Sequence, residues 1–360
     1  MRADDNGRVE WVRIVLLAFG TWLVSGTALG LSHNPHWYVR GWDFPRILIA
    51  ALSLGTGAAY RVLFFEERWW EIAWLAALGA VICYQASRTV AFTPLAPKQV
   101  EWSTRKPGEC SFRLAISNLL QENEEHERWL SVIRSADPDV IVALEVDGKW
   151  KQALAPLRET HPHVVERVQD NYYGMALFSR LPVKRHEVRF LVDEETPSIR
   201  AEIALRSGDT FVLHALHPKP PEPIRNQDSA PRDAELVRVA NEIAQSPDTP
   251  TVVCGDLNDV AWSDTTRIFL RLSRLLDPRV GRGLLATYHA NNPMFRFPLD
   301  HVFHSAHFKL LDLKRVAKVG SDHFPVLIEL SYEPEAKAEQ PQKPPTPGER
   351  RAAGEMVTRA

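Results

Sequence analysis

The stretch TVVCGDLN, residues 251–258, joins a short apolar run to a polar ending. Its first four residues are β-branched or small and apolar, which predicts a buried strand. Gly255, Asp256 and Asn258 follow directly, so that a carboxylate and an amide stand in the turn at the end of the strand. Loops at strand ends hold functional side chains on a rigid scaffold, and the stretch therefore predicts a site as well as a sheet.

Apolar runs of strand length recur throughout residues 109–332. The other predicted strands are Phe112–Ser117, Val140–Leu144, Met175–Ser179, Phe211–Leu216, Leu299–Phe303 and Phe324–Leu330. Helical periodicity separates some of them, over Glu124–Ala136 and over Pro231–Gln245, which opens on a first-turn proline. Alternating strands and helices with continuous apolar strands predict an α/β or α+β domain with buried sheets.

Polar side chains stand at the ends of several of these runs. The further ones are Asn118, Glu145, His217, Asp300, His301, Asp322 and His323. Taken singly, each has an ordinary structural interpretation: a solvated loop acid, a turn or capping residue, or a satisfied histidine. Occurring together in this order, they indicate a catalytic site.

The ordered set resembles the endonuclease/exonuclease/phosphatase family of magnesium-dependent phosphoesterases, in the membrane-anchored bacterial form. The resemblance covers residues 110–332 and rests on these motifs: Asn118, the glutamate of LEV at Glu145, GMALFSR at 174–180, HP at His217, GDLN at 255–258, LDH at 299–301 and SDH at 321–323. It implies a four-layer sandwich of two mixed β-sheets flanked by helices. This agrees with the strands and helices predicted above.

Hydrolysis of a phosphate ester needs a hard cation and fixed donors, because the anionic ester repels an attacking hydroxide. Glu145 supplies a hard oxygen for Mg²⁺, or for Mn²⁺, and Asn118 adds an amide oxygen or orients a bound water. Asp322 is a candidate for a second metal or for supporting the first. Family members often carry an acid where this chain has Leu120, which favours a one-metal site.

The remaining candidates act on the water and the phosphate. Asp256 is expected to align or deprotonate the water, while Asn258 binds a phosphoryl oxygen. Asp300 fixes and charges His323, which serves either as a base or as a phosphate clamp. His217 is preferred over His214 as the donor to the leaving oxygen.

Other polar residues have subsidiary or structural interpretations. Arg232, with Lys219 and Arg225, is expected to line a local anion-binding cleft, and Asn118 is also expected to contact the substrate. His301 points to the opposite face of its strand and is expected to be structural.

The first quarter of the chain has a different character. Seven of the eleven tryptophans precede residue 75, and three apolar runs cover about residues 14–31, 47–65 and 72–92. They predict a membrane anchor of three transmembrane helices over residues 1–92, because each is long enough to cross most of a bilayer core. The alternative is a cleaved signal peptide followed by soluble core helices.

The arginines near these runs suggest an orientation. Arg2, Arg8, Arg13, Arg61 and Arg68 would face the cytoplasm, against Arg40 and Arg46 on the other side. The excess of basic residues predicts a multi-pass inner-membrane protein with an extracytoplasmic catalytic domain at 109–332. Residues 93–108 are expected to form a linker, and the Pro-, Glu-, Lys- and Ala-rich residues 333–360 a disordered tail.

Composition excludes several other classes. The 43 basic and 45 acidic residues leave a net charge of −2, which excludes a strongly basic nucleic-acid coat. The three cysteines show neither paired nor zinc-ligand spacing.

Three functions remain open. A nuclease is slightly favoured over a lipid or small-molecule phosphatase or phospholipase of the sphingomyelinase kind, and a non-catalytic membrane-tethered module is third. The expected partners are the phosphate-ester substrate and the lipid bilayer, with no obligate protein partner.

Overall fold

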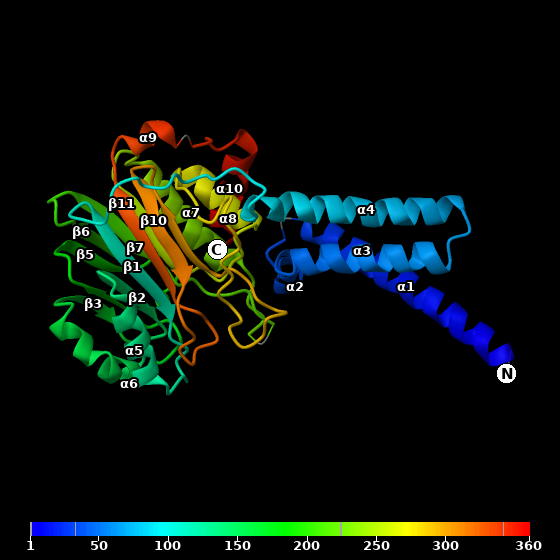
Figure 1. The fold of residues 1–360 in the computed structure, drawn as a ribbon, viewed down its shortest axis with the longest axis horizontal. Coiled ribbons are helices and arrows are strands. Elements are labelled where there is room, and N and C mark those ends of the chain that lie inside the picture. Colours follow the sequence, from blue (N-terminus) through cyan, green and yellow to red (C-terminus); the bar gives the residue numbers. More distant parts are fainter. Residues whose placement is uncertain (1, 33, 224, 341) are drawn as a thin grey trace.

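The computed structural model describes residues 2–32, 34–223, 225–340 and 342–360, and for residues 2–8 the backbone only. The chain forms two parts, a group of long helices from the first 92 residues and a β-sandwich over residues 111–332 (Figure 1).

A six-stranded sheet has the order β10-β11-β1-β2-β4-β3. Its strands are β1 (Ser111–Asn118), β2 (Val140–Leu144), β3 (His163–Arg167), β4 (Met175–Ser179), β10 (Phe308–Arg315) and β11 (Val326–Tyr332). The sheet is mixed, since β1 pairs in parallel with β2 and antiparallel with β11.

A five-stranded sheet has the order β5-β6-β7-β8-β9. Its strands are β5 (Val183–Phe190), β6 (Pro197–Ala204), β7 (Thr210–Ala215), β8 (Thr251–Asp256) and β9 (Asp300–His304). It is mixed as well, because β7 and β8 are parallel while β8 and β9 are antiparallel.

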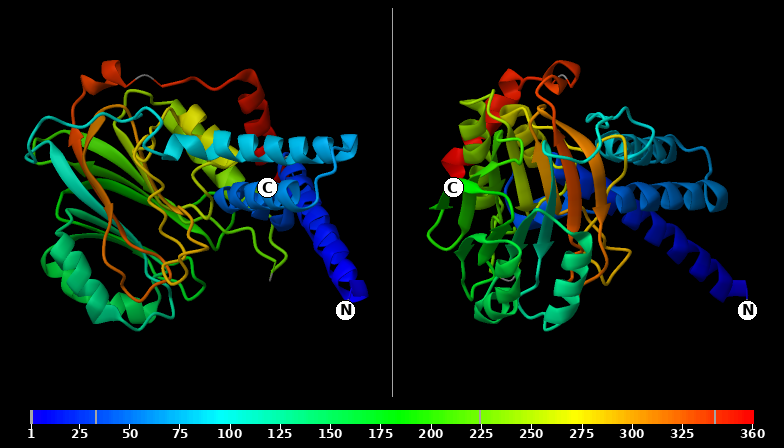
Figure 2. Two further views of the ribbon diagram at one scale, coloured as in Figure 1. Left: turned by 45° about the vertical axis from the view of Figure 1, so that its right-hand side comes forward. Right: turned by 60° about the vertical axis from the view of Figure 1, so that its left-hand side comes forward.

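The two sheets pack face to face, with helices on both outer faces (Figure 2). Apolar side chains of both sheets fill the space between them, including Ile116, Leu213 and Cys254. The first sheet is covered by α5 (His126–Ala136), α6 (Gly148–Ala153) and η3 (Ala155–Glu159), and the second by α7 (Ala230–Ala244) and α8 (Asp264–Ser273). This is the predicted four-layer sandwich, and strands covered on both faces explain the continuous apolar runs in the sequence.

Strand register brings the predicted site residues to one end of the sandwich. Asn118 pairs with Leu144 at the end of the parallel β1–β2 ladder, immediately before Glu145. On the second sheet Asp256 at the end of β8 is the cross-strand partner of Asp300 at the start of β9.

The N-terminal part consists of α1 (Arg2–Gly30), α2 (Trp37–Arg40), η1 (Gly41–Asp43), α3 (Arg46–Leu63), α4 (Trp69–Thr89) and η2 (Val90–Phe92). Three segments are long and apolar enough to cross a membrane: Val9–Gly30, Arg46–Leu63 and Trp69–Phe92. Arg13 pairs with Glu66 and Glu71 at the end away from the sandwich. The side chains of Arg2 and Arg8, which contributed to the predicted orientation, lie outside the described residues.

Specific contacts dock these helices on the sandwich. The Trp262 indole donates to the Asp43 carbonyl at 2.7 Å, and Arg88 near the end of α4 binds Asp264 at 2.8 Å. The rings of Phe44 and Phe297 meet edge to face. The joint therefore combines buried polar bonds with aromatic packing.

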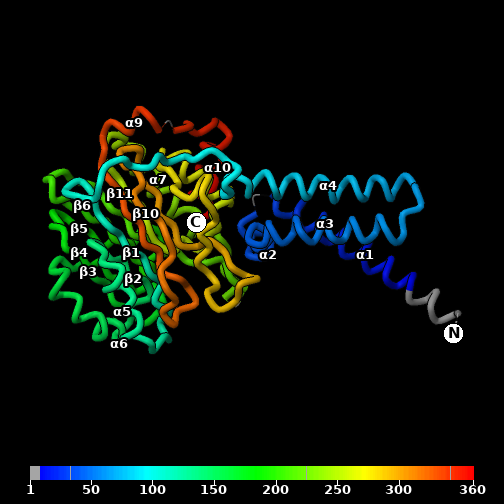
Figure 3. Tube along the Cα trace, viewed as in Figure 1, coloured from blue at the N-terminus to red at the C-terminus, as the bar shows by residue number. Residues whose placement is uncertain are grey.

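The predicted linker over residues 93–108 is packed along the sandwich (Figure 3). Val100 is fully buried, and backbone bonds tie Glu101 and Ser103 to Leu310.

The structure corrects the disordered tail predicted for residues 333–360. This region contains α9 (Ala336–Glu339) and α10 (Pro347–Arg359), which begins with a Thr346–Glu349 capping box. Ala352, Ala353, Met356 and Val357 pack with α7 and α8. The polar composition of this region made its one small apolar helix face hard to recognise. That face is enough to stabilise α10, because it packs against the core formed with α7 and α8.

Gly255 allows the end of β8 to lie close to Leu216, the residue that follows β7. It has φ of +141°, and a Cβ at this position would lie 1.9 Å from the Leu216 carbonyl oxygen. We predict that Gly255→Ala lowers the free energy of unfolding by roughly 3 kcal/mol, through strain and collision. Thermal and denaturant unfolding measure this change. Gly348→Ala is the control, because its nearest neighbour is 3.9 Å away; equal stability of the two variants would contradict the assignment.

Candidate active site

The side chain of Asn118 connects the two sheets. Its Nδ2 donates to Glu145 Oε1 at 2.9 Å on the first sheet and to Asp256 Oδ2 at 3.1 Å on the second. Its Oδ1 accepts from the backbone N–H of Leu120 at 3.0 Å. Because all three bonds are made at once, the amide orientation is determined and both carboxylates are held in place.

Asp256 Oδ2 is the common point of the cluster. His323 Nε2 lies 3.5 Å from this oxygen and His217 Nε2 lies 3.9 Å from it. The other oxygen, Oδ1, accepts from the backbone N–H of Asn258 at 2.9 Å. Burial raises the pKa of Asp256, and the nearby histidines oppose that effect. An aspartate with a raised pKa is a stronger base than an exposed one.

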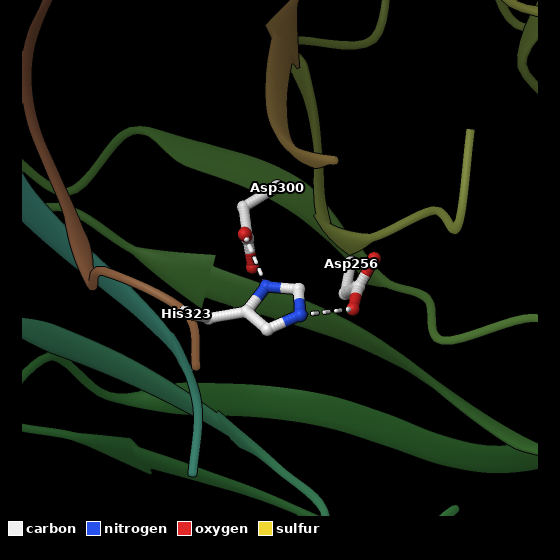
Figure 4. A group of neighbouring side chains, drawn as sticks. All are labelled: Asp256, Asp300 and His323. Atoms are coloured by element: carbon white, nitrogen blue, oxygen red, sulfur yellow. Dashed lines mark hydrogen bonds and ion pairs between the residues drawn. The ribbon is translucent and has the colours of Figure 1, made fainter. Parts of the chain in front are cut away.

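His323 stands between two carboxylates (Figure 4). Its Nδ1 lies 2.7 Å from Asp300 Oδ2, and its Nε2 faces Asp256. Burial by itself lowers the pKa of His323, but the charges of Asp300 and Asp256 outweigh it and raise that pKa to about 10. The ring is therefore an imidazolium at neutral pH, with Nε2 able to donate to an anion.

Glu145 occupies a partly buried position, where the charge of His323 acts on it without forming an ion pair. Oε1 accepts from Asn118, and Oε2 accepts from the Gln121 N–H at 3.0 Å. Burial raises the pKa of Glu145 to about 7. Among the described residues, no basic side chain lies within ion-pair distance of its carboxylate. These properties fit a bound divalent cation, which would supply the missing positive charge.

His217 is 3% exposed, and its ring faces Tyr173. Burial lowers its pKa, so the ring is neutral, and Nδ1 has no hydrogen-bond partner among the described residues. A neutral imidazole beside Asp256 still provides one N–H donor.

These groups line a cleft of about 430 Å³. Its walls contain Phe44, Asn118, Glu145, Tyr172, Tyr173, His217, Pro220, Pro221, Glu222, Arg225, Asp256, Asn258, Tyr288, Leu299, Asp322 and His323. Asp300 lies behind His323 and reaches the cleft through it. Leu120, Glu145 and Asn258 all have positive φ, a concentration of strained backbone that is typical of functional sites.

A search with family models places residues 114–323 in the endonuclease/exonuclease/phosphatase family. The chain belongs to this family. Its members are hydrolases that act on phosphoester bonds, and the strand-end cluster described above falls within the matched residues.

Solved structures agree on the fold. The catalytic domain of human Nocturnin with a bound sulfate anion has a TM-score of 0.51 at 18% identity, over 64% of this chain and all of that one. A humanized Danio rerio TDP2 gives 0.50 at 16% identity, over 62% of this chain and 99% of that one. A Bacteroides vulgatus family member gives 0.51 at 16% identity over the same shares. No curated protein sequence matches the chain.

In the present chain, Arg232 does not line the cleft. The guanidinium is 1% exposed, and it binds Asp233 and the backbone carbonyl of Asn258. The substrate contact predicted for Arg232 is therefore replaced by support of the loop that carries Asn258. Asn258 itself lines the cleft, and its Nδ2 donates to the Pro218 carbonyl at 3.0 Å, leaving one N–H of that amide for a ligand.

The predicted metal ligands are only partly brought together. Asn118 donates from Nδ2 to Glu145 and to Asp256, and its oxygen accepts from Leu120, so it orients the carboxylates. Asp322 lines the same cleft, but it is not grouped with Glu145. Within the described part of the chain, the one cluster with metal-ligand geometry is Asp256, Asp300 and His323. We favour Glu145 over that cluster, because a protonated His323 has no lone pair to offer a metal.

His214 and His301, the two other histidines weighed for the site, are not among the lining residues of the cleft. Arg189 contacts His214 at Nδ1, and burial together with this charge lowers the pKa of His214 to about 3. His301 is buried between Arg279 and the Asp259 carbonyl, in the structural place predicted for it.

Sequence reasoning missed the aromatic walls of the cleft. Tyr172 and Tyr173 precede the GMALFSR motif directly, and this adjacency was an available signal. The Tyr288 ring lies tilted against the His323 ring, and Phe44 comes from the N-terminal part. Neither of these two lies close in sequence to a motif, so only the tertiary structure brings them to the site.

We predict that His323→Ala and Asp300→Asn each reduce turnover about a hundredfold or more, and that the double variant is little worse than either one. Asp300 acts by orienting and charging His323, so its effect disappears once the ring is gone. Steady-state kinetics of the single and double variants test this coupling.

Two further variants serve as controls. His217→Ala should combine with His323→Ala nearly multiplicatively, while His214→Ala should lower stability more than turnover. Multiplicative losses for the His323 and Asp300 pair would exclude this arrangement.

Proposed function

We propose that this chain is a membrane-anchored, Mg²⁺-dependent phosphoesterase. The observation that carries the proposal is the partly buried Glu145 carboxylate, which has no cationic partner among the described residues and shares a cleft with His217, Asp256 and His323. Its raised pKa and its hydrogen bonds from Asn118 and Gln121 fit a carboxylate that holds a hard cation.

The chain's own groups divide the work of hydrolysis. The His323 imidazolium binds a phosphoryl oxygen through Nε2, and Asp300 keeps it charged. Asp256 aligns a water and accepts its proton, favoured by its raised pKa. His217 donates an N–H to the leaving or a phosphoryl oxygen. Mg²⁺ on Glu145, oriented by Asn118, would supply Lewis-acid stabilisation of the charge that develops on the phosphate.

The walls of the cleft favour a small or lipid-borne phosphoester as substrate. Arg225 is the one basic side chain in the described lining apart from the two histidines, against the carboxylates of Glu145, Glu222, Asp256 and Asp322. This charge balance suits a long nucleic-acid backbone poorly.

The position of the cleft also favours a lipid-borne substrate. Phe44 of the anchor forms part of its wall and contacts Phe297. In the loop that contains Phe297, Met294 is 70% exposed, which suits contact with a lipid surface.

A nuclease is the second candidate, because Tyr172 and Tyr288 offer ring surfaces on which single-stranded bases can stack. A panel of lipid, nucleotide, RNA and DNA esters, assayed with the full chain and Mg²⁺, separates the two candidates. Turnover of nucleic acid alone would contradict the lipid-borne substrate.

We predict that Glu145→Gln abolishes Mg²⁺-dependent turnover and leaves the circular dichroism spectrum unchanged. The Glu145 carboxyl, with a pKa of about 7 in the metal-free protein, is mostly protonated below that pH. Mg²⁺ affinity should therefore fall about tenfold from pH 8 to pH 6, because binding must release this proton. Calorimetry over that range measures the change. A pH-independent affinity, or full turnover by Glu145→Gln, would refute Glu145 as ligand.

We also predict that the protein stays in the membrane fraction after a carbonate wash, and that Cys110 faces the extracytoplasmic side. An impermeant thiol reagent should label Cys110, which is partly exposed, in spheroplasts. Cys110→Ser is the matched control and should remove the label, since Cys254 is buried and the exposed Cys83 lies within the proposed membrane span Trp69–Phe92. Labelling that requires lysis would reverse the proposed orientation.

A further inference from the structure

A second cavity lies where α4 meets the sandwich. Its volume is about 460 Å³, and it shares no lining residue with the catalytic cleft. Its walls include the end of α4 with η2, the segment 97–99 and the loop 261–262. The face of α8 that carries Arg267 and Arg271 and the chain before α10 at Lys343 also contribute. Phe92 and Trp262 provide an apolar side.

The charges around this cavity are strongly unbalanced. Five cationic side chains line it, and no carboxylate is among its described lining residues: Arg88, Lys98, Arg267, Arg271 and Lys343. Asp264 and Glu349, just outside the lining, form ion pairs with Arg88 and Arg267.

Three of these cations remain without a counter-charge. For Lys98, Arg271 and Lys343, no carboxylate of the described residues lies within ion-pair distance, and Lys98 instead sits 6.0 Å from the Trp102 ring. Lys98 and Lys343 are exposed and Arg271 is partly buried, and a cavity lined by charges of one sign attracts an ion of the opposite sign.

The position of the cavity matches the headgroup level of a bilayer. Arg88 stands in the last turn of α4, and the apolar segment Trp69–Phe92 ends at the cavity. Just beyond, Leu95 is 87% exposed. A basic pocket directly beside the end of a membrane span is placed to receive a lipid phosphate.

We propose that this cavity binds the phosphate-bearing headgroup of an anionic phospholipid. Arg271, Lys343 and Lys98 would hold the phosphate, and Phe92 and Trp262 would lie against the glycerol and the first acyl carbons. A zwitterionic lipid would add a cation to a pocket already rich in cations and would bind less well.

A bound headgroup would also brace the joint between the two parts of the molecule. Arg88 donates to the Trp262 carbonyl, and the Trp262 indole donates to the Asp43 carbonyl. Trp262 lies six residues after Asp256, in the loop that leaves the catalytic strand. The inference rests on the proposed membrane anchoring, and it does not require the proposed catalytic activity.

The test is lipid binding by the full chain in a neutral detergent, measured by native mass spectrometry with phosphatidylglycerol and with phosphatidylcholine. We expect phosphatidylglycerol to bind at least tenfold more tightly. The double variant Arg271→Gln with Lys343→Gln should lower the affinity for phosphatidylglycerol about fivefold for each cation removed, or roughly 25-fold in all. The affinity for phosphatidylcholine should not change.

A matched pair controls for general charge. Lys184→Gln with Arg185→Gln removes one lysine and one arginine from exposed positions on β5, far from the cavity in sequence, and should leave phosphatidylglycerol affinity as in the parent chain. Equal losses in the two double variants would overturn the site. Thermal unfolding of both double variants shows whether folding is preserved. The single variant Lys343→Gln, at an exposed position, tests the loss of phosphatidylglycerol affinity when one charge is removed.

Two further arms identify the ligand and separate this proposal from the catalytic one. Sodium phosphate that competes with phosphatidylglycerol at equal concentration would overturn the lipid assignment in favour of a soluble anion. Glu145→Gln should keep full phosphatidylglycerol binding although it has lost turnover. A chain that hydrolyses phosphoesters but shows no preference for phosphatidylglycerol refutes the lipid site alone.

Discussion

The amide of Asn118 is the contact on which the site depends. One nitrogen donates to Glu145 at the end of the first sheet and to Asp256 at the end of the second. Two carboxylates brought together at the edge of a core repel each other, and a shared donor offsets that repulsion while fixing their separation. The packing of the two sheets therefore determines the spacing of the two carboxylates in the candidate site.

The buried charges of the site fall into two halves with different requirements. Asp300, His323 and Asp256 form a nearly self-sufficient group, since the imidazolium lies between two carboxylates and its pKa is raised. Glu145 has no such partner among the described residues, and burial raises its pKa toward neutrality. In the first half, the N–H at His323 Nε2 can donate to an anionic oxygen, and the second half is suited to binding a cation, so together they suit a phosphate ester and a metal ion.

The contact between the helices and the sandwich links two separate pockets to one joint. Phe44, directly after η1, forms part of the wall of the catalytic cleft, while Arg88 and Phe92 line the cationic cavity. Trp262 contacts both ends of this joint through its indole and its carbonyl. A ligand that binds in either pocket would therefore meet the N-terminal helices as well as the sandwich.

The sequence by itself determined the strands that are covered on both faces, because burial there requires continuous apolar runs such as Val140–Leu144. It did not reveal β3, β5, β6 or β10, three of which are edge strands. In β5 (Val183–Phe190), for example, the exposed charges leave too few apolar residues for a pattern. Motif order named Asn118 and Asp256 as site residues, yet only the packing of two sheets places these residues, 138 positions apart, within a hydrogen bond. Arg232 shows the same limit of sequence reasoning. Its position in the chain suggested that it binds the substrate, but its guanidinium pairs with the buried carboxylates of Asp233 and Asp259. Local periodicity encodes which segments are buried, whereas the direction of a long polar side chain depends on partners that only the folded chain supplies.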